Sequence, residues 1–143
     1  MGLRFAFAVN EQGDFQNKHF GDADKYIIYE YDSKRLVFID EIENTKRDID
    51  EETKHGSKIK GREITKYLKK FDVKVLISLQ FGKNINTINK KFIPIIVLNS
   101  DINNTLKILE KNMIQIHEEV KNKDTNFELF KISNEILTKY SDN

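Results

Sequence analysis

The chain has 143 residues, of which 38% are hydrophobic and 33% charged, and its formal net charge is +1. This length favours a single domain with a sizeable core, and a charge so close to neutral argues against a general nucleic-acid binder. Because there is no cysteine, disulfides and thiolate-bound zinc or iron–sulfur sites are excluded. The longest early apolar run, residues 5–9, is too short to span a membrane or form a signal-peptide core, so we expect a soluble, cytoplasmic protein.

The first part of the chain predicts three strands. Residues 3–9 form a nearly continuous apolar run, which is typical of a central strand covered on both faces. Residues 10–18 are polar and predict a loop. Residues 25–31 and 35–42 are rich in β-forming residues, and the short connection between them favours an antiparallel hairpin.

Helices and strands then alternate. Residues 43–58 are expected to form a mobile loop, and the apolar spacing that follows predicts a helix over residues 59–71. Residues 73–79 and 93–98 have the pattern of buried strands. Between them we expect a short helix whose apolar residues are Ile85, Ile88 and Phe92.

A long helix is expected next, capped by Ser100 or Asp101. Its apolar face comprises Leu106, Leu109, Met113, Ile116 and Val120. The resulting order, β-β-β-α-β-α-β-α, predicts a mixed sheet flanked by helices, because strands joined through helices run parallel.

The C-terminal segment, residues 122–143, has two interpretations. Residues 127–132 fit either an added strand or the start of a terminal helix. The apolar groups of this segment need a partner in the same chain or in a second copy, so a homodimer stays open. We therefore divide the chain into a domain over residues 1–121 and an extension over residues 122–143 of open structure.

The most informative stretch is residues 18–23, with the sequence KHFGDA, directly before a predicted strand. It places His19 in a short loop between two apolar runs, where an exposed neutral imidazole can bind iron or another transition metal. The same imidazole can instead bond to the backbone, and both interpretations stay open. His117, at the edge of an amphipathic helix, is interpreted as a surface residue.

A second candidate lies at residues 80–84, where a buried strand passes into a helix. In α/β proteins this is a common place for ligands. Gly82 would let an anion approach the free N–H groups of the helix start, and Lys83 adds positive charge. A single glycine before a helix is also common in plain tight turns.

Charge is polarised along the chain. Residues 40–52 hold seven acids, whereas residues 54–70, which include His55, hold seven lysines or arginines and one acid. These segments are either solvated surfaces or, for the basic one, a rim that steers a small anionic ligand. No Ser–His–Asp order, glycine-rich phosphate fingerprint or HExxH pattern is present, so we do not expect an enzyme.

The KHFGDA loop and the strand after it resemble the HFG-x-A signature of the dinitrogenase iron–molybdenum cofactor family, which includes NifX-like proteins, NafY and the C-terminal domain of NifB. The resemblance covers residues 3–111. Later matches follow in order: His55-Gly56, Gly61-Arg62, Leu68, Phe81-Gly82 and the strand at residues 93–97.

The resemblance implies an α/β, ribonuclease H-like three-layer fold. Its mixed sheet would have five strands in the order 3-2-1-4-5, with strand 2 antiparallel. Family members bind or carry iron–molybdenum cofactor or related iron–sulfur clusters. By the same resemblance His19 is the expected metal ligand. The other expected cofactor-binding residues are Phe20, Gly21, His55, Gly82 and Lys83.

These observations predict a non-catalytic binding, carrier or accessory protein for an iron–molybdenum-type or other metal–sulfur cluster. Its expected partners are the cluster or a small anionic ligand, together with cluster-assembly or acceptor proteins, and neither nucleic acid nor membrane. The alternative is a protein-interaction or regulatory module of the same fold without a cofactor. The lack of thiols and the apolar C-terminal segment favour that alternative.

Overall fold

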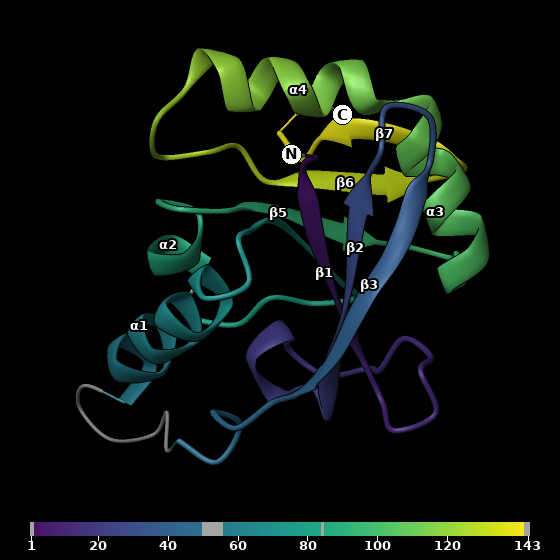
Figure 1. Cartoon of the computed structure of the whole chain (residues 1–143). Coiled ribbons are helices and arrows are strands. Elements are labelled where there is room, and N and C mark those ends of the chain that lie inside the picture. Colours follow the sequence, from purple (N-terminus) through teal and green to yellow (C-terminus); the bar gives the residue numbers. More distant parts are fainter. Residues whose placement is uncertain (1, 50–55, 84, 142–143) are drawn as a thin grey trace.

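A computed structural model describes residues 2–49, 56–83 and 85–141 of the chain. The described strands form one mixed sheet, and helices lie on both of its faces (Figure 1). The strands are β1 (Arg4–Val9), β2 (Lys25–Tyr31), β3 (Leu36–Glu43), β4 (Val73–Ser78), β5 (Ile93–Val97), β6 (Phe130–Ser133) and β7 (Ile136–Lys139).

Strand order in the sheet is β3-β2-β1-β4-β5-β6-β7. β1, β4, β5 and β6 are parallel to one another. β2 runs antiparallel to both of its neighbours, β1 and β3, and β7 runs antiparallel to β6. The predicted order 3-2-1-4-5 with an antiparallel second strand is confirmed. The predicted strand number is wrong, because the described sheet has seven strands and not five.

Two helical layers enclose the sheet. The helices are η1 (Phe20–Asp22), α1 (Gly56–Lys69), α2 (Ile85–Ile88), α3 (Ile102–Lys111) and α4 (Met113–Asn122). α1 and α2 cover one face and α3 and α4 the other (Figure 1). β1 is buried on both faces because its side chains alternate: Phe5 and Phe7 join the core under α3 and α4, and Ala6 and Ala8 the core under α1 and α2.

The long helix expected after Asp101 is two helices. The Asp101 carboxylate accepts a hydrogen bond from the backbone N–H of Asn104 at 2.8 Å, so this residue is the N-cap. Asn112 separates α3 from α4: its side-chain amide donates to the carbonyl of Ile108 at 2.7 Å, and its backbone has φ −119° and ψ 22°. Asparagine competes in this way with the helical backbone ladder, and the apolar periodicity does not reveal it.

Two other predicted boundaries shift. At the ends of the loop expected at residues 43–58, β3 continues to Glu43 and α1 begins at Gly56, and residues 50–55 between them lie outside the described residues. The short helix expected to include Phe92 is the single turn α2, and Phe92 lies beyond it, fully buried between α2 and β5.

The C-terminal segment forms the β6–β7 hairpin, so the strand interpretation of residues 127–132 is confirmed for its last residues. Asn134 and Glu135 link the strands with φ values of 53° and 62°, the backbone of a tight two-residue turn. β6 pairs with β5, and its buried Phe130 and Ile132 join the core under α3 and α4. The apolar groups of the segment are therefore largely covered within the chain, and a homodimer stays a prediction.

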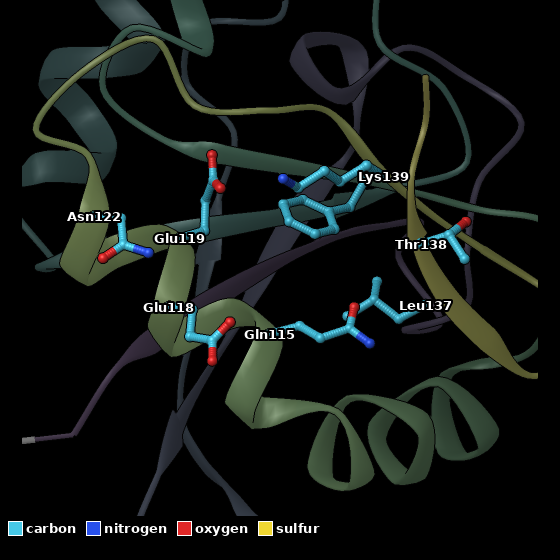
Figure 2. Close-up of a pocket in the computed structure, with 8 residues that line it drawn as sticks. Gln115, Glu118, Glu119, Asn122, Leu137, Thr138 and Lys139 are labelled. Carbon is cyan, nitrogen blue, oxygen red and sulfur yellow. The ribbon is translucent and has the colours of Figure 1, made fainter. Parts of the chain in front are cut away.

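α4 meets this hairpin across a pocket of about 350 Å³. Figure 2 shows Gln115 and Glu118 of α4 on one side and Leu137 and Thr138 of β7 on the other. Glu119, which is buried beside the pocket, accepts a hydrogen bond from the backbone N–H of Glu128 at 2.8 Å. This bond ties α4 to the chain that leads into β6.

Candidate functional site

The two predicted site segments meet at one edge of the sheet. β1 and β4 are parallel neighbours, so the loops that follow their carboxyl ends lie side by side. The backbone N–H of Phe20 donates to the carbonyl of Gln80 at 2.9 Å, and His19 pairs with Gln80 as an isolated parallel bridge. The loop that carries His19 is thus fastened to the loop that carries Gly82.

The imidazole of His19 lies against Gly82. A Cβ atom on Gly82 would stand 2.6 Å from Nδ1 of His19, so only glycine leaves room for the ring in this position. The His19 side chain is 45% exposed, and its Nδ1 is 3.8 Å from a carboxylate oxygen of Asp22. Within the described part of the chain the ring makes no hydrogen bond to the backbone, which leaves it accessible to a ligand.

Buried groups hold the loop beneath His19. Phe20 is fully buried and stacks between the rings of Tyr26 and Phe81, with centroid distances of 4.7 and 5.5 Å. The Tyr26 hydroxyl donates to the carbonyl of Phe20 at 2.8 Å, and the Asn44 amide donates to the carbonyl of Gly21 at 2.9 Å. Phe20 and Gly21, both predicted as cofactor-binding, are therefore placed as anchors below the exposed ring.

A charged network adjoins the loop. Lys60 of α1 is 1% exposed; its ammonium pairs with the carboxylate of Asp22 and donates to the carbonyl of Arg47 at 3.1 Å. Arg47 in turn pairs with Asp24 at 3.0 Å. Burial and then the negative charge of Asp22 raise the pKa of Tyr26 well above its usual value. An open cavity of about 520 Å³ lies here, lined by Lys18, Asp22, Arg47 and Asp48.

Sequence reasoning missed this network. The sequence predicts Lys60 only as one charge of the basic run at residues 54–70, which is either a solvated surface or a rim that steers an anion. A signal was present, because Lys60, Ile64 and Leu68 recur at four-residue intervals, and both of the others are buried on the inner face of α1. A lysine in register with a buried stripe indicates a buried ammonium with a specific partner.

The other predicted site residues, Lys83, Gly82 and His55, differ in how far the structure supports a role at the site. Lys83 is exposed on the same loop as Gly82. α2 has only four residues, so few aligned peptide dipoles add up there, and the helix-dipole argument for an anion at Gly82 carries little weight. His55 lies outside the described residues. Among those that are described, no three histidine, aspartate or glutamate side chains converge to hold a metal ion.

The architecture defines a class of protein: an α/β fold in which helices cover both faces of the sheet, and a half-exposed imidazole lies where two loops meet at the carboxyl edge of that sheet. A family model described as dinitrogenase iron-molybdenum cofactor matches residues 1–112, and the chain belongs to this family. The match includes His19 and Gly82 and ends at the break between α3 and α4, so α4, β6 and β7 lie beyond it. No curated protein matches the chain. None of the helices in the described ranges is long and apolar enough to cross a membrane.

Proposed function

We propose that this chain is a non-catalytic carrier or accessory protein that binds an iron–molybdenum-type or other metal–sulfur cluster, with His19 as the protein ligand. One observation carries the proposal: the half-exposed imidazole is seated against Gly82 in a chain of the dinitrogenase iron-molybdenum cofactor family. The order and directions of the first five strands also support a ribonuclease H-like fold.

The orientation of the ring suits metal binding through one nitrogen. Nδ1 is the ring atom nearest to Gly82 and faces the Asp22 carboxylate, so the neighbouring negative charge favours a proton on Nδ1. Nε2 lies farther from Gly82 and makes no hydrogen bond with the described residues. Its lone pair is then the one offered to an incoming iron or molybdenum atom.

The composition of the site predicts weak, reversible binding. There is no thiolate in the chain, and among the described residues His19 is the one imidazole at the site, so these residues offer a cluster one strong protein ligand. Lys83 is exposed beside it and forms no ion pair within the described part of the chain, so it can attract an anionic cluster. Reversible binding is what a carrier needs when it passes its cargo to an acceptor protein.

The alternative of an interaction module without a cofactor loses one of its supports. An apolar C-terminal segment in need of a partner favours this alternative, but Phe127, Phe130, Ile132 and Leu137 are buried in the core of the same chain. The remaining support for the alternative is the absence of cysteine. The imidazole of His19 weakens this support, because it can bind a metal in place of a thiolate.

Anaerobic titration with an isolated iron–molybdenum cofactor or a synthetic iron–sulfur cluster, followed by visible absorption, tests this function. We expect saturable binding by the unmodified chain, and a loss of at least about tenfold in affinity for His19→Ala. His117→Ala is the matched control: His117 is exposed and its ring packs against Tyr31, and the variant should bind as the unmodified chain does. Equal affinity in His19→Ala rejects the role of His19, and failure of the unmodified chain to bind any cluster rejects the function.

A further inference from the structure

A second candidate site lies on the α1–α2 side of the sheet. It is a groove of about 230 Å³ lined by Arg62, Thr65, Lys66, Thr87, Lys90 and Lys91. Four of these six side chains are cationic and none is acidic. Positive charges gathered around a concave, apolar site attract small oxyanions more strongly than the same charges spread over a flat surface.

Two separate segments build this groove. Arg62, Thr65 and Lys66 occupy positions i, i+3 and i+4 of α1 and so share one face of that helix. Lys90 and Lys91 follow α2, which packs beside α1 on the same face of the sheet (Figure 1). Lys66 lies in the last turn of α1, where the helix dipole favours a positive charge. Lys90 and Lys91 have no such position, so the dipole does not account for them.

Most of this positive charge is uncompensated. Lys66 lies 3.6 Å from Glu63, whereas the side chains of Arg62, Lys90 and Lys91 form no ion pair with any described residue. Lys91 also acts on Lys74, whose pKa is lowered by burial, then by the like charges of Lys69 and Lys91, against an opposite effect of Asp124. An anion placed at the groove would compensate the charges of Arg62, Lys90 and Lys91.

The walls and the rim of the groove differ in chemistry. Its walls are mainly the aliphatic parts of the lining side chains, so the charged ends lie at the rim. The hydroxyl of Thr65 donates to the carbonyl of Gly61 at 2.8 Å. An arginine fork and lysine point charges around the rim match the oxygens of phosphate groups.

We propose that this groove binds a small ligand with two or more adjacent phosphate groups, either an inorganic polyphosphate or a nucleoside di- or triphosphate. The site is distinct from the His19 opening and does not depend on cluster binding. All four cations are exposed to solvent, so the interaction is screened and its affinity falls steeply as salt is added.

The test is a titration of the whole chain at low salt with tripolyphosphate, ATP, AMP and a glutamate-rich peptide, followed by calorimetry. We expect tripolyphosphate and ATP to bind and AMP to bind much more weakly. ATP binding tighter than tripolyphosphate means that the nucleoside contacts the aliphatic walls, and equal binding means that the phosphates alone are recognised. Either result supports the proposal.

Matched double variants separate a site from general attraction. Arg62→Gln with Lys90→Gln should weaken phosphate binding by at least about tenfold. Lys107→Gln with Lys121→Gln removes the same charge from exposed positions of α3 and α4, on the other face of the sheet, and should leave binding unchanged. Equal losses in both variants, no phosphate binding, or a glutamate-rich peptide that binds as tightly as tripolyphosphate would overturn the proposal. His19→Ala should keep phosphate binding intact, so this site and the cluster site can fail independently.

Discussion

The imidazole of His19 and the backbone of Gly82 are in such close contact that a Cβ atom at residue 82 would stand 2.6 Å from Nδ1 and 3.1 Å from Cγ of the ring. The two residues belong to loops that follow different strands, β1 and β4. Because these strands are parallel neighbours, the contact depends on the sheet, and each loop fixes the position of the other.

Gly82→Ala should displace the His19 ring at little cost in stability. The ring is 45% exposed and can rotate into solvent, so we expect the free energy of unfolding to fall by about 1 kcal/mol or less. Cluster affinity should fall nearly as far as in His19→Ala, because the ring leaves its position. Urea unfolding and anaerobic titration of the same variant measure both effects.

The double variant is the control for this contact. In the His19→Ala background an alanine at residue 82 meets no ring atom. Gly82→Ala should then be neutral or stabilise the fold by about 0.4–1 kcal/mol, because alanine lowers the conformational entropy of the unfolded chain. A Gly82→Ala effect of the same size with and without His19 would show that the ring does not occupy the observed position.

Tyr26→Phe should destabilise the loop that carries His19. It removes the hydrogen bond from the Tyr26 hydroxyl to the carbonyl of Phe20, at 2.8 Å in a fully buried site, and we expect a loss of about 1–2 kcal/mol. Tyr140→Phe is the control because Tyr140 is exposed, and its effect should be close to zero. Equal effects of the two substitutions in chemical denaturation would contradict the anchoring role of Tyr26.

Tyr26 should also contribute to alkaline unfolding. Burial, then the charge of Asp22, raise the pKa of its phenol in the folded chain well above the usual value. Above about pH 10 the unfolded chain ionises this group while the folded chain does not, so its contribution to stability is complete below that pH and is lost as pH rises further. Tyr26→Phe should therefore lose less stability between pH 9 and pH 11 than the unmodified chain, a range of about one unit on either side of the ordinary pKa. A parallel decline of both proteins would contradict this account.

Asp32→Asn should remove an acid-sensitive part of the stability. Backbone N–H groups of Arg35 and Lys34 donate to the Asp32 carboxylate at 2.9 and 3.1 Å, and these bonds lower the pKa of the carboxyl in the folded chain. The contribution is complete above the unfolded pKa of about 3.9 and is lost as pH falls through the lower folded value. The unmodified chain should exceed Asp32→Asn in melting temperature at neutral pH, and the difference should vanish in strong acid. A difference that persists unchanged there would show that the carboxylate charge has no part in it.

Phe130→Ala should show that the C-terminal hairpin belongs to the core. Phe130 is 2% exposed and packs with the residues under α3 and α4, so the substitution should cost about 3–5 kcal/mol. Ile136→Ala, on the exposed side of β7, should cost far less. If Phe130→Ala melts like the unmodified chain, the boundary predicted near residue 121 describes a dispensable extension. A large loss makes the hairpin part of one cooperative unit.

The sequence predicts much of the fold because its strands show either alternating apolar and polar residues or continuous apolar runs. Residues 3–9, 25–31 and 35–42 contain β1, β2 and β3 nearly to the residue. The break at Asn112 stays hidden, because the apolar spacing continues through it and only a side-chain hydrogen bond to Ile108 marks it. The β6–β7 hairpin is equally weakly marked, since its turn uses Asn-Glu where Asn-Gly is the common signal.

The candidate site also has one part that the sequence predicts and another that it does not. The HFG loop is visible as a local motif, and the family model includes it. The contact of His19 with Gly82 requires the parallel pairing of β1 and β4, which joins segments about seventy residues apart and has no local signature. The groove with Arg62 and Lys90 is likewise created by the packing of α1 beside α2, so neither segment alone predicts it.

The most direct test of the account is whether a histidine nitrogen of residue 19 binds the cluster. The variant His55→Asn with His117→Asn leaves His19 as the sole histidine of the chain. After anaerobic loading with a paramagnetic iron–sulfur cluster and labelling of histidine with ¹⁵N, pulsed electron paramagnetic resonance should detect a nitrogen coupled to the cluster. The account predicts this coupling in the single-histidine chain and its loss in His19→Ala; a loaded single-histidine chain without the coupling would contradict it.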